Sequence, residues 1–436
     1  MESVPMKTVE IKGSRSSWHC TVPETWEPIK ALGAGAYASV TAFRGPDGTE
    51  FACKKVDKVF SHGILALRTL REIRLLAHFR HPNVLSIREL FLQGSETSPD
   101  CYVCLEIMDG DLHNLIHHEK APLLGEFQVQ CILYQILRGL LCLRRAQVLH
   151  RDLKPGNILV RSGGDVKIAD LGLGRKLEDN NNTDHDDLPP VVLTEYVVTR
   201  FYRAPEVVLT ATKYTYAMDM WSVGCILGEM LTQKALFQGR HSLDQVKVML
   251  IFLERYAEID KSWIPRDSPA WNYMEKCMEK RPQADKSERP PVELPQDKPE
   301  ATDLLMQMLR FNPERRISVE DALYHPYVET FDARSDPEVA AAEAVIPIDW
   351  SFDRKPPFDG EGKVNLRELR NAFSKAAKLV AVSSEAVAGG AAVSNASPRT
   401  PTRSPRNGAV PDESPPGTAA PARVQTPWGR RWQKRE

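Results

Sequence analysis

The sequence lacks the features of several large protein classes. Its 57 basic and 58 acidic residues leave a formal net charge of −1, so bulk charge indicates neither nucleic acid nor a membrane as a partner. No uncharged apolar run is long enough to span a bilayer, and the N-terminus, with Glu2, lacks a basic-then-apolar secretory pattern. No internal repeat is visible. We therefore expect a protein of the cytoplasm, the nucleus or both.

Cysteines are few, and their positions do not indicate disulfides. The eight cysteines are scattered, mostly in apolar segments, as is usual for reduced thiols in a core. Cys101 and Cys104 have the spacing of half a zinc or redox motif, but residues 101–105 have the composition of a strand, which sends the two thiols to opposite faces. No second pair or histidine cluster accompanies them, so we interpret both as core residues.

What the sequence does contain is enough apolar patterning for a large core. Its 436 residues, 42% of them hydrophobic, suit a two-lobed protein with an added tail. Residues 1–25 have no clear period, whereas short strands with turn signals begin at Trp26 and predict an antiparallel sheet. Residues 127–143 predict a buried central helix, and most later segments are helical in period. An earlier helix is predicted by an apolar stripe at Ala66, Leu70, Ile73 and Ala77.

Two segments have the composition of non-core chain. Residues 281–300 hold five prolines and many charges, which predicts a surface insertion between helices. The 56 residues from Ala381 to the end contain eight prolines and five glycines and few large aliphatics. Such a segment buries too little apolar surface to fold, so we expect a disordered tail over residues 381–436.

The first chemical motif is a glycine-rich turn followed by a lysine. Residues 33–40 (Gly-Ala-Gly-Ala-Tyr-Ala-Ser-Val) lie between two expected strands, where glycines let backbone amides approach phosphate oxygens. Lys54 ends the next strand, 14 residues after Val40, and is positioned for its ammonium to reach phosphates. Glu72 on the following helix could pair with Lys54. Each feature alone has an ordinary structural explanation as a hairpin turn or a surface charge.

The second motif is far more specific. Residues 150–157 (His-Arg-Asp-Leu-Lys-Pro-Gly-Asn) have the full spacing of a phosphoryl-transfer catalytic loop. Here Asp152 would accept the proton of a substrate hydroxyl, Lys154 would offset developing charge, and Asn157 would hold Mg²⁺. Asp170 follows an apolar strand 13 residues after Asn157, and its carboxylate suits a second Mg²⁺ ligand.

These motifs in this order resemble the eukaryotic protein kinase family over about residues 26–330. The resemblance implies an α+β, two-lobed protein-kinase fold, with a small antiparallel-sheet N-lobe carrying one main helix and a larger, mostly helical C-lobe. It divides the chain into an N-terminal extension (1–25), an N-lobe (26–107), a C-lobe (108–328), a C-terminal extension packing back on the kinase (329–380) and the tail (381–436). It also implies ATP and two Mg²⁺ ions as cofactors. The ATP-binding residues that it implies are Leu32, Gly33, Ala34, Gly35, Val40, Ala52, Lys54, Glu106 and Met108.

Within that family the chain resembles the mitogen-activated protein (MAP) kinases. The residues responsible are Thr194-Glu195-Tyr196, typical of the extracellular-signal-regulated type, before residues 197–206 (Val-Val-Thr-Arg-Phe-Tyr-Arg-Ala-Pro-Glu). The resemblance implies that an upstream dual-specificity kinase phosphorylates Thr194 and Tyr196. It further implies Ser/Thr-Pro protein substrates, phosphatases and docking-motif proteins as partners. The arginines that match the family's phosphate contacts are Arg71, Arg151 and Arg175 for Thr194, and Arg200 and Arg203 for Tyr196.

Two other functions stay open at this stage. Residues 168–175 also resemble plant-type cyclin-dependent kinases, although the cyclin-binding helix signature is missing. A catalytically dead scaffold is a second alternative, which the joint presence of Lys54, Asp152, Asn157 and Asp170 argues against.

Two weaker patterns lie towards the C-terminus. Asp332, Asp336 and Glu338 fall near the region where MAP kinases receive basic partner motifs, so we expect a docking surface there. Residues 357–368 end like a calcium-binding loop, but Pro357 stands at the first ligand position. We interpret that segment instead as the family's C-terminal extension crossing back to the small lobe, with a helix over residues 364–379.

Overall fold

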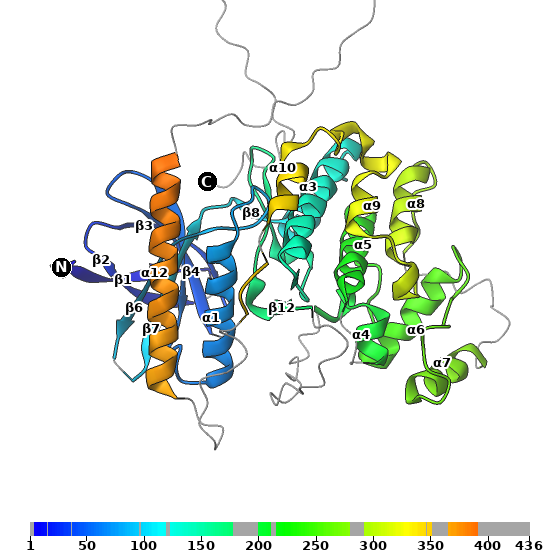
Figure 1. Ribbon diagram of the computed structural model, residues 1–436, viewed down its shortest axis with the longest axis horizontal. Coiled ribbons are helices and arrows are strands. Elements are labelled where there is room, and N and C mark those ends of the chain that lie inside the picture. Colours follow the sequence, from blue (N-terminus) through cyan, green and yellow to red (C-terminus); the bar gives the residue numbers. More distant parts are fainter. Residues whose placement is uncertain are drawn as a thin grey trace, which may run out of the picture.

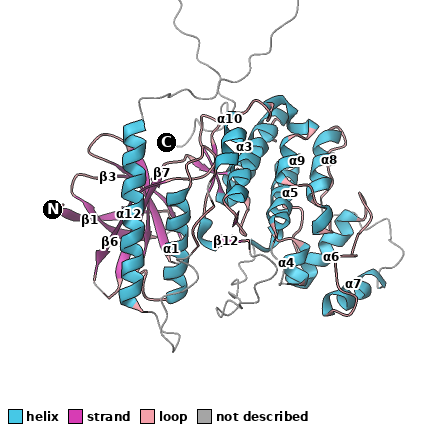
Figure 2. Ribbon diagram, viewed as in Figure 1, coloured by secondary structure: helices cyan, strands magenta, loops and turns pink. Residues whose placement is uncertain are grey.

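The computed structural model describes residues 4–14, 16–35, 37–95, 97–118, 123–177, 199–210, 215–279, 292–345, 347–350 and 365–390. Its strands and helices separate into a smaller, sheet-rich lobe and a larger helical lobe (Figures 1 and 2). The strands are β1 Met6–Lys12, β2 Ser17–Pro23, β3 Glu27–Ala34, β4 Ala38–Arg44, β5 Glu50–Val56, β6 Ile87–Gly94, β7 Pro99–Glu106, β8 Gly110–Asp111, β9 Val148–Leu149, β10 Ile158–Val160, β11 Val166–Ile168 and β12 Arg175–Lys176. The helices are α1 Gly63–His78, α2 Leu112–His117, α3 Glu126–Arg145, α4 Pro205–Leu209, α5 Tyr216–Thr232, α6 Ser242–Leu253, α7 Pro269–Glu279, α8 Pro299–Met308, α9 Val319–Leu323, α10 Pro337–Ala341 and α12 Leu366–Gly390.

The small lobe is built on one antiparallel sheet with the strand order β3-β4-β5-β7-β6. Side chains alternate across β7: Cys101 belongs to the main hydrophobic core, whereas Tyr102 and Cys104 belong to a second cluster on the opposite face. The prediction that Cys101 and Cys104 lie on opposite faces is therefore confirmed. Both thiols are buried and free, as expected.

A hairpin that the sequence analysis did not anticipate covers the second cluster. Strands β1 and β2 pair in register from Met6 opposite Pro23 to Lys12 opposite Ser17. Only Ile11, Cys20 and Val22 of these strands are buried. Residues 17–23 alternate polar and apolar side chains, a short strand signal that a search for a longer period misses. The hairpin is attached through the Trp18 indole N–H, which donates to Thr41 Oγ1 over 3.0 Å.

The large lobe has the buried central helix that the sequence predicts. Eleven residues of α3 are buried, whereas Phe127 near its start is 41% exposed. Helix α5, which lies beside α3, is buried along almost its whole length. In the small lobe, the predicted apolar stripe of α1 is confirmed, since all four of its residues are buried. No helix in the described part of the chain is long and apolar enough to cross a membrane.

The C-terminal helix α12 lies against the small lobe, next to α1 and β6 (Figure 1). Its buried residues recur at spacings of four, three and four: Leu369, Phe373, Ala376 and Val380. The ring of Phe373 meets that of Phe60 edge-on at 5.3 Å. The boundary that we expected at 380/381 is wrong, because the helix continues through residue 381 to Gly390. Residues 381–390 contain no leucine, isoleucine or aromatic residue, so no apolar stripe in the sequence predicts this last part of the helix.

A buried histidine stands where the two lobes meet. His81 Nδ1 accepts the backbone N–H of Asn83 at 3.0 Å, and the Asn83 carbonyl in turn accepts the Ile168 N–H at 2.9 Å. Burial, together with the nearby cations Arg138 and Lys167, lowers the pKa of His81 from its ordinary 6.5 to about 3. The folded protein therefore keeps this imidazole neutral under conditions that protonate the unfolded chain.

That difference predicts an acid-sensitive stability. Between pH 6.5 and about 3 the unfolded state binds one more proton at His81 than the folded state, so stability falls as the pH falls. We expect His81→Gln to remove this dependence, a difference of about 2–3 kcal/mol between pH 7 and 4.5 in urea unfolding. His19→Gln, at an exposed site on β2, is the matched control and should keep the wild-type pH slope. Equal slopes for all three proteins would contradict the prediction.

Candidate active site

The glycine-rich turn is formed by β3 and β4. Strand register places Gly33 opposite Val40, and Val40 opposite Lys54 on β5. The Gly35 N–H donates to Ala38 O over 2.7 Å. A Cβ atom at Gly33 would meet no atom within 4 Å, so its neighbours do not require glycine there. That open space suits the close approach of a ligand to the backbone. The other nucleotide-binding residues expected in this turn, Leu32 and Ala34, are exposed beside it.

Lys54 forms an ion pair with Glu72 and lies in the electric field of Asp170. Its Nζ lies 2.7 and 2.8 Å from the two oxygens of Glu72, which α1 presents to the sheet. Burial acts to lower the pKa of Lys54, but Glu72 and Asp170 outweigh burial and hold the pKa above its usual value. Burial raises the pKa of Glu72, and Asp170 acts in the same direction. The one positive charge of Lys54 thus lies near the two negative charges of Glu72 and Asp170, so these three groups together carry a net negative charge.

Asp152 is the centre of the loop between β9 and β10. It is buried, and its Oδ2 accepts hydrogen bonds from Lys154 Nζ at 2.8 Å and from Asn157 Nδ2 at 3.0 Å. The other oxygen, Oδ1, is buried and has no hydrogen-bond partner among the residues that the structure describes. A buried carboxylate oxygen without a donor is costly, so this atom is suited to receive a hydroxyl proton from a bound molecule.

The loop is anchored from α5. Asp219 is buried and accepts the N–H of His150 at 2.8 Å and that of Arg151 at 2.9 Å, one on each oxygen. His150 Nδ1 accepts the Asp152 N–H at 3.2 Å, so Nε2 carries the proton and donates to Ala169 O at 2.9 Å. These bonds tie the loop of Asp152 to the strand end that carries Asp170.

Asn157 and Asp170 provide oxygen ligands for a hard cation. The Asn157 amide nitrogen donates to Asp152, which leaves its amide oxygen as the ligand atom. The side chain of Asp170 remains accessible to solvent although protein surrounds it closely. That enclosure acts to raise the pKa of Asp170, but Lys54, His150 and Lys154 outweigh it and keep the pKa below its usual value. An ionised carboxylate and an amide oxygen fit the ligand preference of Mg²⁺.

Of the remaining expected nucleotide-binding residues, Ala52 lies on β5, Glu106 ends β7 and Met108 follows shortly after it. Ala52 and Met108 are both buried. The side chain of Glu106 points into an ion-pair network, with Oε1 3.0 Å from Lys167 Nζ and accepting the Ser86 hydroxyl at 3.0 Å. Only the backbone of Glu106 can therefore serve a ligand. Neither Lys167 nor Ser86 was singled out from the sequence, because nothing local marks them as its partners.

The arginines expected to receive phosphate lie on several elements. Arg71 of α1 is buried, and its guanidinium donates to Gly172 O at 3.5 Å. Arg175 lies on β12 opposite Leu149 of β9, the strand that leads into Arg151. Arg200 is buried and donates to the carbonyl oxygens of Gly239 and Arg240. These protein contacts hold Arg200 in place, so a phosphate on Tyr196 would have to compete with them. Arg203 lies just before α4, where its N–H donates to Arg200 O at 3.2 Å.

Some of the expected sites lie outside the described residues. Thr194 and Tyr196 are among them, as is most of the calcium-like segment 357–368. The acidic docking region, in contrast, is described and requires a correction. Asp336 Oδ2 accepts the Tyr134 hydroxyl at 2.7 Å and the Arg138 guanidinium at 2.9 Å, because α3 supplies both donors. Asp336 thus serves the fold, and the exposed Asp332 is the better candidate for a partner's basic motif.

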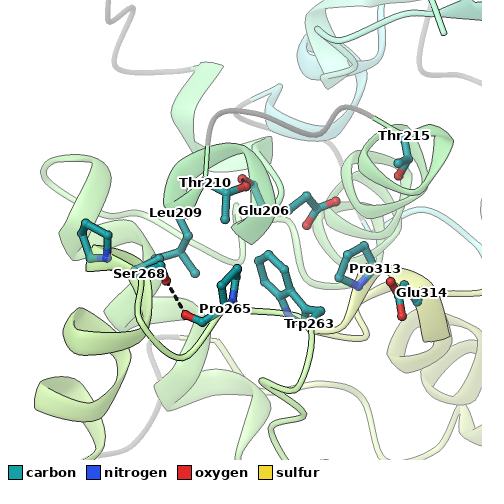
Figure 3. Close-up of a pocket in the computed structure, with 11 residues that line it drawn as sticks. Glu206, Leu209, Thr210, Thr215, Trp263, Pro265, Ser268, Pro313 and Glu314 are labelled. Atoms are coloured by element: carbon teal, nitrogen blue, oxygen red, sulfur yellow. Dashed lines mark hydrogen bonds between the residues drawn. The ribbon is translucent and has the colours of Figure 1, made fainter. Parts of the chain in front are cut away.

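A separate cavity of about 650 Å³ lies between α4, the residues around Trp263 and the turn Pro313–Arg315 (Figure 3). None of the expected nucleotide, metal or catalytic residues is among the described residues that line it. One of its two carboxylates, Glu206, pairs with Arg316, whose two terminal nitrogens lie 2.7 and 3.0 Å from the Glu206 oxygens. Arg316 Nη1 also donates to Ala217 O at 2.6 Å, which ties α4 to the start of α5.

Comparison with known proteins matches residues 26–328 to the protein kinase domain. The chain is 40% identical to mitogen-activated protein kinase 7 of Arabidopsis thaliana over 329 residues, which cover 75% of this chain and 83% of that protein. It is 39% identical to mitogen-activated protein kinase spk1 of Schizosaccharomyces pombe over 322 residues, or 73% of this chain and 82% of that one. Among solved structures, a MAP kinase from Leishmania major superposes with a TM-score of 0.60 at 29% identity, covering 81% of this chain and 94% of that chain.

The Glu206–Arg316 pair predicts a large stability effect. The Arg316 side chain is 0% exposed and that of Glu206 is 3% exposed, so Arg316→Met leaves a buried carboxylate without its cation. We expect a loss of about 3–5 kcal/mol in chemical denaturation. Arg315→Met is the matched control: its side chain is 66% exposed and lies 2.9 Å from Asp260, so the loss should stay within about 1 kcal/mol. Similar losses in the two variants would refute this account.

Proposed function

The chain belongs to the protein kinase family and, within it, to the MAP kinases, and on that basis we propose that it is a proline-directed kinase activated by phosphorylation of Thr194 and Tyr196. Family membership makes it an ATP-dependent serine/threonine kinase of signal transduction, with protein substrates, upstream kinases, phosphatases and docking proteins as its kinds of partner. It also favours the MAP kinase interpretation over the cyclin-dependent one.

The observation that carries the catalytic proposal is the buried, unpartnered Oδ1 of Asp152. In our proposal the acceptor hydroxyl donates to this oxygen, which orients the hydroxyl for attack and takes up its proton. Lys154, 2.8 Å from the other oxygen, offsets negative charge on the group in transfer. The chemistry is mostly positioning, which the anchoring of this loop by Asp219 supports.

The family implies ATP and a divalent metal, usually Mg²⁺, and we propose that Asn157 and Asp170 hold that metal. When bound, the metal supplies positive charge that neutralises the phosphates of ATP. Lys54 would contact the same phosphates from β5, and Glu72 would keep its ammonium in position. The open space at Gly33 supports approach of the triphosphate to the backbone of the turn.

For regulation we propose that phosphates on Thr194 and Tyr196 are bound by the arginines around the loop. Each phosphate brings about −1.5 to −2 charges, and guanidinium groups bind such charge in a bidentate manner. Arg71 is suited to couple this event to catalysis, because it lies on the same helix as Glu72 and already contacts Gly172. An ordered segment would then align α1 with the catalytic loop.

The role of Asp152 predicts loss of transfer in an isosteric variant. We expect Asp152→Asn to lower the rate of γ-phosphate transfer to a Ser-containing protein by about 10²–10⁴-fold, because an amide cannot accept the hydroxyl proton. Asp165→Asn, at a partly exposed turn nearby, should retain wild-type rate. The transfer rates of both variants are measured with radiolabelled ATP. Undiminished transfer by the Asp152 variant would exclude the catalytic proposal, and absence of transfer by the wild-type protein under all conditions would favour a scaffold.

The proposed activation predicts that both Thr194 and Tyr196 must be phosphorylated for full activity. After treatment with a dual-specificity kinase that acts on Thr-Glu-Tyr, wild-type activity should rise by at least about tenfold, which corresponds to about 1.4 kcal/mol of activation free energy. Thr194→Ala and Tyr196→Phe should each lose most of that rise, whereas Tyr256→Phe should keep it. Mass spectrometry of the segment confirms the modification state. A Tyr196→Phe protein that activates fully would instead point to the cyclin-dependent alternative.

The proposed preference for proline predicts that the kinase distinguishes substrates by the residue that follows the phosphorylated Ser or Thr. Proline lacks an N–H, so it leaves no unsatisfied donor in the pocket that the family resemblance assigns to Arg203. We expect kcat/KM for a Ser-Pro peptide to exceed that for its Ser-Ala counterpart by about 10- to 200-fold. A peptide series that differs only at this residue measures the ratio. Equal values across the series would remove proline direction from the proposal while leaving kinase activity untouched.

A further inference from the structure

Two histidines of α2 converge with a buried glutamate of α5. His113 and His117 are one helical turn apart, and their ring centroids are 4.6 Å apart. His117 Nε2 lies 2.6 Å from Glu229 Oε1, although the two residues are far apart in the sequence. The candidate ligand atoms of all three residues lie within 4.8 Å of one another. Neither the catalytic nor the regulatory proposal uses any of these residues.

The glutamate is held in a fixed orientation from behind. Its side chain is 1% exposed, and its second oxygen, Oε2, accepts the Tyr202 hydroxyl at 2.6 Å. A hydrogen bond to the outer oxygen of a carboxylate is the arrangement that orients metal ligands in proteins. The two histidines, in contrast, lie at the surface and can change rotamer to complete a coordination shell.

The charge at Glu229 also favours a cation. Of the two neighbours just named, Tyr202 is neutral, and His117 is a cation only when it is protonated. A buried carboxylate is stable only when its charge is compensated. A divalent ion between Glu229 and the two imidazoles would supply that compensation without requiring a protonated histidine.

We propose that His113, His117 and Glu229 form a zinc site, with a fourth position open to water. Two imidazoles and one carboxylate are a ligand set that zinc takes in tetrahedral sites, at about 2.0–2.2 Å from each ligand atom. Imidazole nitrogen suits zinc better than Mg²⁺, which prefers oxygen ligands such as those of Asn157 and Asp170. The ligand atoms of the two sites therefore favour different metals, zinc at the histidines and Mg²⁺ at Asn157 and Asp170.

The proposed zinc site is connected to the catalytic loop through the two helices that carry its ligands. Helix α2 contacts the turn Pro155–Asn157, and α5 carries Asp219, which anchors the same loop from the other end. A bound zinc ion joins α2 to α5 and thereby braces both supports of Asp152. Binding to the folded state alone also raises the unfolding temperature.

The test is a zinc titration of the full chain. Protein stripped with a chelator is titrated with Zn²⁺, without nucleotide and in excess Mg²⁺, against a chromophoric chelator as competitor. We expect one equivalent to bind with micromolar or tighter affinity. His113→Gln and His117→Gln should each weaken binding by about tenfold or more, and Tyr202→Phe by about tenfold or more. Co²⁺ in place of Zn²⁺ should show tetrahedral absorption that both histidine variants lose.

The matched control is His118→Gln, which removes an exposed histidine next to the site without touching it. Its zinc affinity should equal that of the wild-type protein, and each histidine variant should unfold in one cooperative transition without metal, which shows that all are folded. The proposal is overturned if the wild-type protein binds no zinc, if binding survives both histidine substitutions, or if only one of the two histidines matters. Survival in both variants would assign the zinc to other residues, such as the cysteines.

Discussion

The structure of the catalytic centre depends on one buried carboxylate that takes no part in the proposed chemistry. Asp219 accepts two consecutive backbone N–H groups, those of His150 and Arg151, and so determines where the next residue, Asp152, points. Burial raises the pKa of Asp219, yet the two N–H donors stabilise its ionised form. Because the donors belong to the backbone and the accepting carboxylate is buried on α5, the loop is held independently of the rotamers of His150 and Arg151.

The charged residues of the catalytic site form a connected series that begins at that anchor. His150 carries the constraint to Ala169 and hence to Asp170, whose carboxylate shares the ammonium of Lys54 with Glu72. The small lobe contributes Lys54 from its sheet and Glu72 from α1, while the large lobe contributes Asp152 and Asp170. The site is therefore complete only while both lobes hold their places.

The sequence predicted those parts of the molecule that carry local signals. The catalytic loop, the α1 stripe, the central helix and the opposite faces of Cys101 and Cys104 all follow from spacing or periodicity. The hairpin β1-β2 was missed because the apolar alternation in its strands is short. Residues 381–390 of α12 were missed because they contain no leucine, isoleucine or aromatic residue. The engagement of Asp336 by α3 and the convergence of His117 with Glu229 depend on contacts between distant segments, which no local pattern encodes.

The helix α12 extends the catalytic centre to a part of the chain beyond the matched kinase domain. It packs against α1, and α1 carries Glu72. Helix α12 therefore helps to hold Glu72 in position for its ion pair with Lys54. Displacement of α12 would expose Phe60 to water and leave α1 free to change its position. Helix α12 thereby influences the ion pair of the site from outside the matched kinase domain.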